Sequence, residues 1–154
     1  MNLYIVVKFF HLLSLASFLG SIFTFIFISA MIDNADVESA SGRIIIAEGT
    51  KWITMPSLWI LACTGLLSGW KRYGTGSGFF KIKLLLAVLM LANAYIFILP
   101  AVNEATKIAV ESGEILSDTY RTAYRKESLF GALNVIFAFA AMIAGLRSVS
   151  LRQE

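Results

Sequence analysis

The chain consists of long uncharged stretches that alternate with shorter charged segments. Four windows contain no Asp, Glu, Lys or Arg: Phe9–Ile32, Trp52–Trp70, Leu84–Val102 and Ser128–Leu146. They hold 24, 19, 19 and 19 residues, and about 20 apolar residues let a helix cross a bilayer. Because each backbone N–H group in hydrocarbon must bond within its own segment, α-helices are expected. The pattern predicts an all-α polytopic membrane protein, a bundle of four transmembrane helices at about residues 4–32, 52–70, 80–102 and 128–147.

The composition agrees with a membrane-embedded chain and excludes several other classes of protein. Hydrophobic residues make up 58% of the 154 residues and charged residues 15%, against roughly 45–50% and 25% in soluble domains. A soluble domain, a secreted disulfide scaffold and a nucleic-acid-binding domain are therefore excluded. The single cysteine, Cys63, allows no internal disulfide and no c-type haem attachment. Since no repeat or domain boundary is visible, residues 1–154 are expected to form one integral membrane domain.

The connecting segments set the expected topology. Asp33–Lys51 and Trp70–Lys83 are expected to be loops, the second a flexible glycine-rich turn. The third helix is expected to continue past Pro100, and Ser117 or Asp118 to cap the last helix. Four spans place both termini on one side, and the short basic loop Trp70–Lys83 favours the cytoplasm for that side. The predicted location is a bacterial inner (cytoplasmic) membrane.

His11 is the only histidine, and it lies inside the first span. Polar side chains in a span are costly, so each one is a candidate functional residue. Small polar residues follow on the same side of this helix: Ser14, Ser17, Ser21 and Thr24. Two interpretations stay open. Either this stripe is a packing seam in which His11 bonds to a neighbouring helix, or a neutral imidazole faces a cavity and binds a metal or haem iron.

Lys83 opens the third span. A lysine near a helix end commonly extends to the membrane interface, which is the simpler interpretation. However, the first and third helices run parallel, so Lys83 and His11 approach the membrane from the same side and at comparable depth. The two side chains can then flank one pocket and offer a haem two axial nitrogens, if desolvation keeps the lysine neutral. Lys8, one turn before His11, is the less favoured second candidate.

Other polar and sulfur-containing side chains complete the set of candidates. Asn93 and Asn134 lie at similar depth on the side opposite the termini. They are expected either to bond each other across the helices or to line the far end of the same cavity. A copper site is a further alternative, because Cu(I) prefers soft ligands, and the residues considered for it are His11, Cys63, Met31, Met55, Met90 and Met142.

Several short motifs resemble those of one membrane family. The first span runs Val7-Lys8-Phe9-Phe10-His11 and ends at Leu19-Gly20, and the third opens with Phe79-Phe80-Lys81-Ile82-Lys83-Leu84. These motifs resemble the HemJ-type protoporphyrinogen oxidases and the related CopD-like membrane proteins, as do Pro56 and Gly65 in the second span and Phe130–Asn134 in the fourth. The resemblance implies that His11 and Lys83 are the functional pair and that they are associated with a b-type haem.

The chain also departs from that family's pattern. Ser21–Phe27 has neither the arginine nor the second histidine that follows the first-span glycine in HemJ proteins. Val135 follows Asn134 where the family has glutamate, and the terminal Lys-Pro is missing. The chain looks closer to short, uncharacterised four-span membrane proteins of the same superfamily, so the scaffold and the haem are carried over more readily than the oxidase activity.

The resulting prediction is an integral membrane protein that binds haem b or a porphyrin. Its expected cofactor-binding residues are His11, Lys83, Asn93 and Asn134, with His11 and Lys83 as metal ligands. If it is an enzyme, it is a membrane oxidoreductase, either a porphyrinogen oxidase or a quinone-linked redox protein. The expected partners are the lipid bilayer, a porphyrin or quinone and a second copy of the chain. The alternatives are a cofactor-free accessory subunit and a copper or small-solute permease component.

Overall fold

The computed structural model describes residues 3–34, 39–113, 115 and 117–150, and these residues are helical apart from short turns. The α-helices are α1 (Leu3–Asn34), α2 (Ser39–Gly49), α3 (Met55–Tyr73), α4 (Gly78–Asn93), α5 (Leu99–Glu111) and α6 (Asp118–Ser150). Two π-helical turns, η1 (Thr50–Thr54) and η2 (Ala94–Ile98), join α2 to α3 and α4 to α5. The described part of the chain contains no strand, which confirms the all-α prediction.

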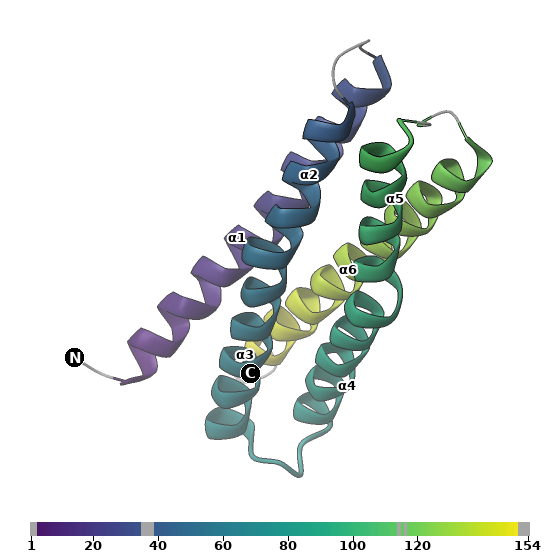
Figure 1. Cartoon of the computed structure of the whole chain (residues 1–154). Coiled ribbons are helices and arrows are strands. Elements are labelled where there is room, and N and C mark those ends of the chain that lie inside the picture. The colour runs from purple at the N-terminus through teal and green to yellow at the C-terminus, as the bar shows by residue number, and fades with distance from the viewer. Residues whose placement is uncertain (1–2, 35–38, 114, 116, 151–154) are drawn as a thin grey trace.

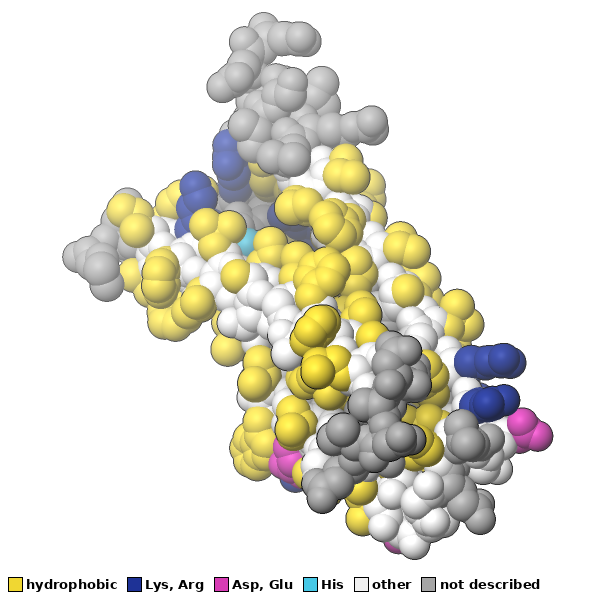
Figure 2. All heavy atoms as spheres, turned by 90° about the horizontal axis from the view of Figure 1, so that it is seen from above, with side chains coloured by type: hydrophobic (Ala, Val, Ile, Leu, Met, Phe, Trp, Pro, Cys, Tyr) yellow, Lys and Arg dark blue, Asp and Glu magenta, His cyan; other side chains and the backbone are white. Residues whose placement is uncertain are grey.

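The six α-helices form four long helical columns. Columns long and apolar enough to cross a membrane cover Leu3–Met31, Ala40–Tyr73, Gly78–Glu111 and Asp118–Gly145. In Figure 1 the α2–α3 and α4–α5 columns run side by side and meet in a turn, while α1 and α6 run obliquely to them. Hydrophobic side chains spread over the face shown in Figure 2, and charged side chains lie toward its margins. The chain is therefore a multi-pass membrane protein, a four-helix bundle.

The second column begins earlier than the sequence pattern predicted. Asp33–Lys51 was expected to be a loop, but the chain is helical from Ser39 onward. This extension packs against the bundle, because Ile46 is fully buried in a cluster with Val102, and Phe25 packs against that cluster. Tertiary burial of one face therefore stabilises a helix that carries charged residues and lies outside the uncharged window.

The ends of the other columns agree with expectation. The third column continues past Pro100 to Glu111, and Gly113 then adopts a positive φ of 68°. α6 begins at Asp118, where the Ser117 hydroxyl accepts a hydrogen bond of 3.2 Å from the Tyr120 N–H group. This is the capping arrangement expected of a serine before a helix.

Each π-turn ends two residues before a proline. Proline lacks an N–H group, and its ring clashes with the carbonyl four residues earlier. Pro56 follows η1 and Pro100 follows η2. In both turns the backbone widens by one residue, since the N–H groups of Met55 and Leu99 bond five residues back. The wider turn accommodates the proline without breaking the column, and such turns are frequent near functional sites.

The two middle columns are longer than a bilayer requires. Each has 34 residues, about 51 Å at 1.5 Å per residue, whereas the hydrocarbon core is about 30 Å thick. The excess lies at the end away from the termini, where α5 and α6 pack through Ala105, Ala109, Tyr120 and Ala123. These four residues lie beyond the uncharged windows. The bundle therefore projects from the membrane at this end.

Candidate functional site

A cavity of about 390 Å³ opens between all four columns near the end that holds the termini. We call it the histidine cavity. It is lined by residues of α1 (His11, Leu12, Leu15), α3 (Leu61, Ala62, Gly65, Leu66), α4 (Lys83, Ala87, Met90) and α6 (Ala138, Ala141, Met142, Gly145). Its volume falls within the roughly 300–1,000 Å³ that is usual for small-molecule sites. The structure thus places His11 and Lys83 in one cavity, as the parallel course of their helices predicted.

The imidazole of His11 is held by a hydrogen bond to α3. Its Nδ1 lies 3.0 Å from the Thr64 hydroxyl oxygen, and that hydroxyl donates its own proton to the Ile60 carbonyl at 2.5 Å. With the Thr64 proton on the Ile60 carbonyl, the hydroxyl accepts from Nδ1–H. In that tautomer the lone pair of the neutral ring is on Nε2. The ring also has a hydrogen bond to the backbone of Leu61.

Two glycines lie beside His11 and Lys83. A Cβ atom at Gly65 would lie 3.1 Å from Cε1 of His11, tighter than ordinary van der Waals contact. A Cβ atom at Gly145 would lie 3.7 Å from the Lys83 ammonium nitrogen. Glycine on α3 therefore lets the imidazole sit against the helix backbone, whereas a Cβ atom on α6 would make only an ordinary contact with the lysine.

Lys83 supplies the positive charge of this cavity. Its ammonium nitrogen lies 4.9 Å from the centre of the Phe79 ring, which gives a cation–π contact. The ion pairs of the described chain are Arg43–Glu127 and Lys107–Glu111, and neither involves Lys83. A cation in apolar walls without a carboxylate partner favours an anionic group on any ligand.

Two of the sulfur-containing side chains considered for copper line the histidine cavity. Met90 and Met142 line the histidine cavity, whereas Met31 and Cys63 are exposed. In the described part of the chain, no cluster of three or more His, Cys, Asp or Glu side chains suited to a metal occurs. Lys8, the second lysine candidate, is exposed and does not line the cavity.

Asn93 and Asn134 bond to each other across the bundle, one of the two arrangements predicted for them. The Asn93 amide nitrogen donates to the Asn134 side-chain oxygen and to the Phe130 carbonyl, both at 2.8 Å. The Asn134 amide nitrogen lies 3.3 Å from the Met90 carbonyl. Neither asparagine lines the histidine cavity, so their role at a porphyrin stays a prediction.

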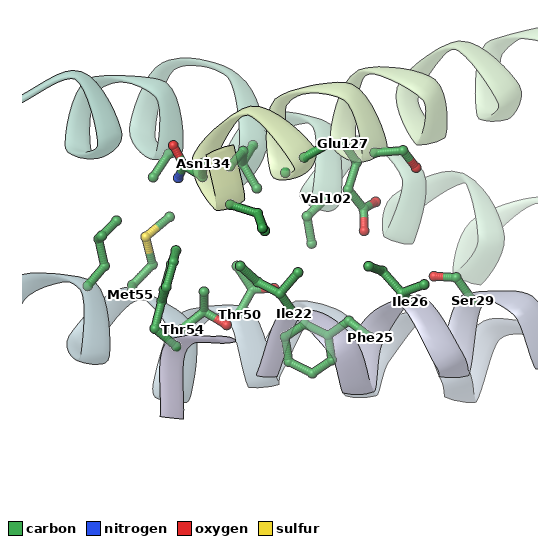
Figure 3. A pocket seen from close by; sticks show the side chains of 18 of the residues that line it. Ile22, Phe25, Ile26, Ser29, Thr50, Thr54, Met55, Val102, Glu127 and Asn134 are labelled. Carbon is green, nitrogen blue, oxygen red and sulfur yellow. The ribbon is translucent and has the colours of Figure 1, made fainter. Parts of the chain in front are cut away.

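A second cavity, of about 330 Å³, lies toward the projecting end of the bundle (Figure 3). We call it the glutamate cavity, because Glu127 lines it together with Asn134 and side chains of α1, η1, α3, η2, α5 and α6. It was not predicted from the sequence, since its walls consist of ordinary apolar residues far apart in the chain.

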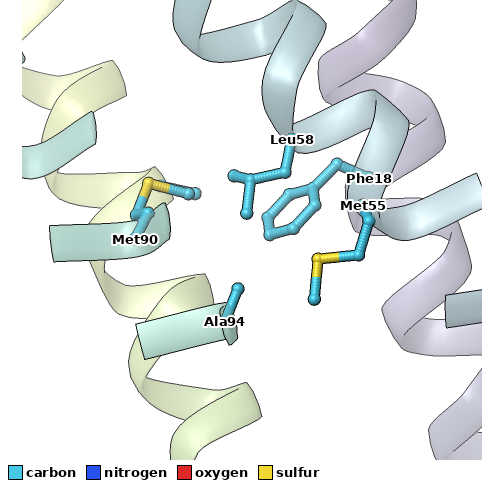
Figure 4. Close-up of a cluster of buried hydrophobic side chains, with 6 residues drawn as sticks. Phe18, Met55, Leu58, Met90 and Ala94 are labelled. Carbon is cyan, nitrogen blue, oxygen red and sulfur yellow. The ribbon is translucent and has the colours of Figure 1, made fainter. Parts of the chain in front are cut away.

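A layer of buried hydrophobic side chains separates the two cavities. It contains Phe18, Met55, Leu58, Met90, Ala94 and Ala138. Figure 4 shows Phe18, Leu58 and Met55 pointing toward Met90 and Ala94 across the space between the helices. Met90 and Ala138 also line the histidine cavity, whereas the other four line the glutamate cavity. The two cavities are therefore back to back, and each has its own polar groups.

Arg43 and Glu127 form a buried ion pair that sequence reasoning missed. Their side chains are 0% and 13% exposed, and one terminal nitrogen of Arg43 bonds to a carboxylate oxygen of Glu127. The other two guanidinium nitrogens, Nε and Nη1, are buried without a hydrogen-bond partner, and the Tyr120 ring centre lies 5.8 Å from the guanidinium carbon. The available signal is an arginine directly before the apolar run Ile44–Ile46, in a segment that the charge pattern predicts to be a loop.

The resemblance to the HemJ-type proteins rests on a few residues in each span and stays a prediction. Its functional pair, His11 and Lys83, shares a cavity in this structure. Comparison with protein-family models, with curated proteins and with solved structures finds no match to this chain.

Proposed function

We propose that this protein binds haem b, or a related porphyrin, in the histidine cavity. The observation that carries the proposal is the His11 imidazole, which lines the cavity with Lys83 and whose Nδ1 lies 3.0 Å from the Thr64 hydroxyl oxygen. In the tautomer protonated at Nδ1, Nε2 would carry the lone pair that binds iron. Histidines that bind metals almost always donate their other ring proton to a protein acceptor. The Thr64 contact would anchor the ring in the way that a metal-binding histidine is anchored.

The other groups in the cavity suit the same ligand. A porphyrin is a large apolar ring with carboxylate side chains, and the cavity combines apolar walls with the Lys83 ammonium group. Lys83 would either bind a propionate or, when neutral, offer a second nitrogen to the iron. Met90 and Met142 offer thioether sulfurs from α4 and α6, and a histidine–methionine pair is a known form of axial ligation.

Haem in this position would supply one-electron redox chemistry. The residues of the chain would hold and orient it: His11 through Nε2, Lys83 through charge, and the leucines of α1 and α3 by excluding water. An oxidase of porphyrinogens, or a quinone-linked redox protein, is the enzymatic form of this proposal. We further propose a bacterial inner membrane, cytoplasmic termini and a homo-oligomer as its setting.

A haem titration of the purified apoprotein in detergent tests the binding site. Binding is followed by the absorbance of the Soret band, and we expect His11→Ala to weaken it at least about tenfold. Lys83→Ala is compared with Lys81→Ala, because Lys81 is exposed two residues away and does not line the cavity. Weaker haem binding in Lys83→Ala but not in Lys81→Ala supports a role for Lys83. Equal haem affinities for the three variants and the parent protein would refute the proposal.

One observation favours a second candidate, a cofactor-free accessory subunit. The His11–Thr64 bond joins α1 to α3, so the histidine already has a structural partner. Under this alternative the protein stays colourless when haem is supplied, and His11→Ala lowers the melting temperature without changing any spectrum. The copper alternative rests on His11, Met90 and Met142, which share the cavity, and a titration with Cu(I) in the absence of haem tests it.

A further inference from the structure

The glutamate cavity has a polar end and an apolar end. In Figure 3 the Glu127 carboxylate of α6 and the Ser29 hydroxyl of α1 lie toward one end, and Met55 and Asn134 lie toward the other. Thr50, on η1, also lines the cavity. Asn134 is already hydrogen-bonded within the bundle. The polar groups available to a ligand therefore gather at one end.

Glu127 presents a free acceptor to this cavity. One of its carboxylate oxygens bonds to Arg43. The other, Oε1, has no hydrogen-bond partner among the described residues, although the side chain is only 13% exposed. Nor do the hydroxyl groups of Ser29 and Thr50 bond to any part of the described chain, although both residues are buried. An acceptor and two hydroxyl groups thus face the space without partners.

The net charge at this end is zero, because the Arg43 guanidinium neutralises the Glu127 carboxylate. A carboxylate or phosphate on the ligand would face the Glu127 oxygen and be repelled. An ammonium group would find its partner already neutralised by an arginine that is completely buried. A neutral group that donates a hydrogen bond, such as a hydroxyl, fits this end best.

The position of the polar end in the membrane agrees with a lipid-like ligand. Glu127 directly precedes the uncharged window Ser128–Leu146, and Thr50 is two residues from Trp52, a residue type enriched at the membrane interface. The apolar end, with Leu58 and Ala94, lies inside the uncharged windows. An amphiphile in one leaflet ordinarily has its head group at the interface and its hydrocarbon chain directed into the membrane, which matches the two ends of this cavity.

The cavity is accessible from the side. α1 packs mainly against α2, η1 and α3, whereas α6 packs against α4, η2 and α5. Ile26 of α1 and Ala132 of α6 line the cavity and are exposed at the surface of the bundle. The opening between α1 and α6 therefore faces the lipid, and a ligand can enter from the bilayer.

We propose that the glutamate cavity binds a single-chain amphiphile with an uncharged, hydroxyl-bearing head group, such as a monoacylglycerol or a long-chain alcohol. Its hydroxyl donates to Oε1 of Glu127, with Ser29 and Thr50 as further partners. The hydrocarbon chain of the ligand adds little to the binding free energy, because the surrounding lipid tails are as apolar as the cavity wall. Selectivity therefore comes from the head group. The proposal is independent of haem, since a layer of hydrophobic side chains separates the two cavities.

Photolabelling of the full chain in phosphatidylcholine vesicles tests this proposal. The probe is a long-chain alcohol with a photoreactive diazirine and a terminal alkyne, and the comparison is the fatty acid with the same chain and the same photoreactive group. We expect the alcohol to label peptides containing Ile26 or Val135 about tenfold more than the acid does, the order expected for one hydrogen bond to a charged group. Excess unlabelled monoacylglycerol should abolish this labelling.

Gly131→Leu provides a variant that fills the cavity. Gly131 lines it, and a Cβ atom there would meet nothing within 4 Å. Gly20→Leu is the matched control. A Cβ atom at Gly20 would also meet nothing within 4 Å, but Gly20 is exposed and does not line the cavity. Loss of alcohol labelling in Gly131→Leu alone supports the proposal. Equal labelling by alcohol and acid, or labelling that Gly131→Leu leaves unchanged, would overturn it.

Discussion

The buried ion pair between Arg43 and Glu127 is expected to be the most sensitive polar contact in the bundle. It joins α2 to α6, residues 84 positions apart in sequence, and the Arg43 side chain is completely buried. Two of its three guanidinium nitrogens already have no hydrogen-bond partner. Glu127→Ala would remove the remaining acceptor and leave a buried charge without compensation.

The expected cost follows from this geometry. Removing one partner of a buried pair typically costs about 3–5 kcal/mol. In a protein of this size, 1 kcal/mol shifts the melting temperature by roughly 2–4 °C, so we expect Glu127→Ala to lower it by about 6–20 °C. Replacing both partners, as in Arg43→Met with Glu127→Leu, should restore most of the loss, because an apolar pair requires no desolvation of charge.

Thermal unfolding of the purified protein in detergent, followed by intrinsic tryptophan fluorescence, measures these shifts. Lys107 and Glu111 provide the control, because they form an ion pair at 4.0 Å with side chains 69% and 66% exposed. Exposed pairs of this kind contribute at most about 1 kcal/mol, so Glu111→Ala should change the melting temperature little. If Glu127→Ala were no more harmful than Glu111→Ala, or if the double variant were as unstable as the single one, our reasoning about burial would be refuted.

Two further predictions concern the helix contacts around the candidate site. Gly65→Val should displace the His11 ring and weaken haem binding in a Soret titration, because a Cβ atom at Gly65 would lie 3.1 Å from Cε1 of His11. Gly69→Ala is the control and should bind haem normally, because its Cβ atom would meet Phe80 at an ordinary 3.4 Å. Asn93→Leu and Asn134→Leu should show a coupling of about 0.6–2 kcal/mol in a double-mutant cycle of unfolding free energies, the range known for polar contacts between membrane helices. Strictly additive effects would contradict the 2.8 Å bond between the two amides.

The four columns were predictable because the bilayer imposes a simple rule on the sequence. A helix in hydrocarbon must be about 20 residues long and nearly free of charge, and the four uncharged windows lie within α1, η1–α3, α4–η2–α5 and α6. The extension of the second column from Trp52 back to Ser39 was not predictable in this way. That segment projects beyond the membrane, and its helix depends on packing against α5 instead of on hydropathy.

The candidate site was predictable in its main residues but not in its surroundings. Parallel helices and equal depth were enough to place His11 and Lys83 together. The Thr64 contact depends on the rotation of α3 about its axis, and the methionine sulfurs in the cavity depend on that of α4 and α6. Sequence spacing alone does not fix these rotations. The glutamate cavity was missed for a similar reason, because cavities arise where packed surfaces fail to fit.

The absorption spectrum of the purified protein, expressed with ample haem supply, tests the central claim most directly. The account predicts a Soret band that scales with the protein, disappears in His11→Ala and persists in the matched surface variant Lys81→Ala. A colourless parent protein, or a band that His11→Ala leaves unchanged, would contradict haem binding through His11.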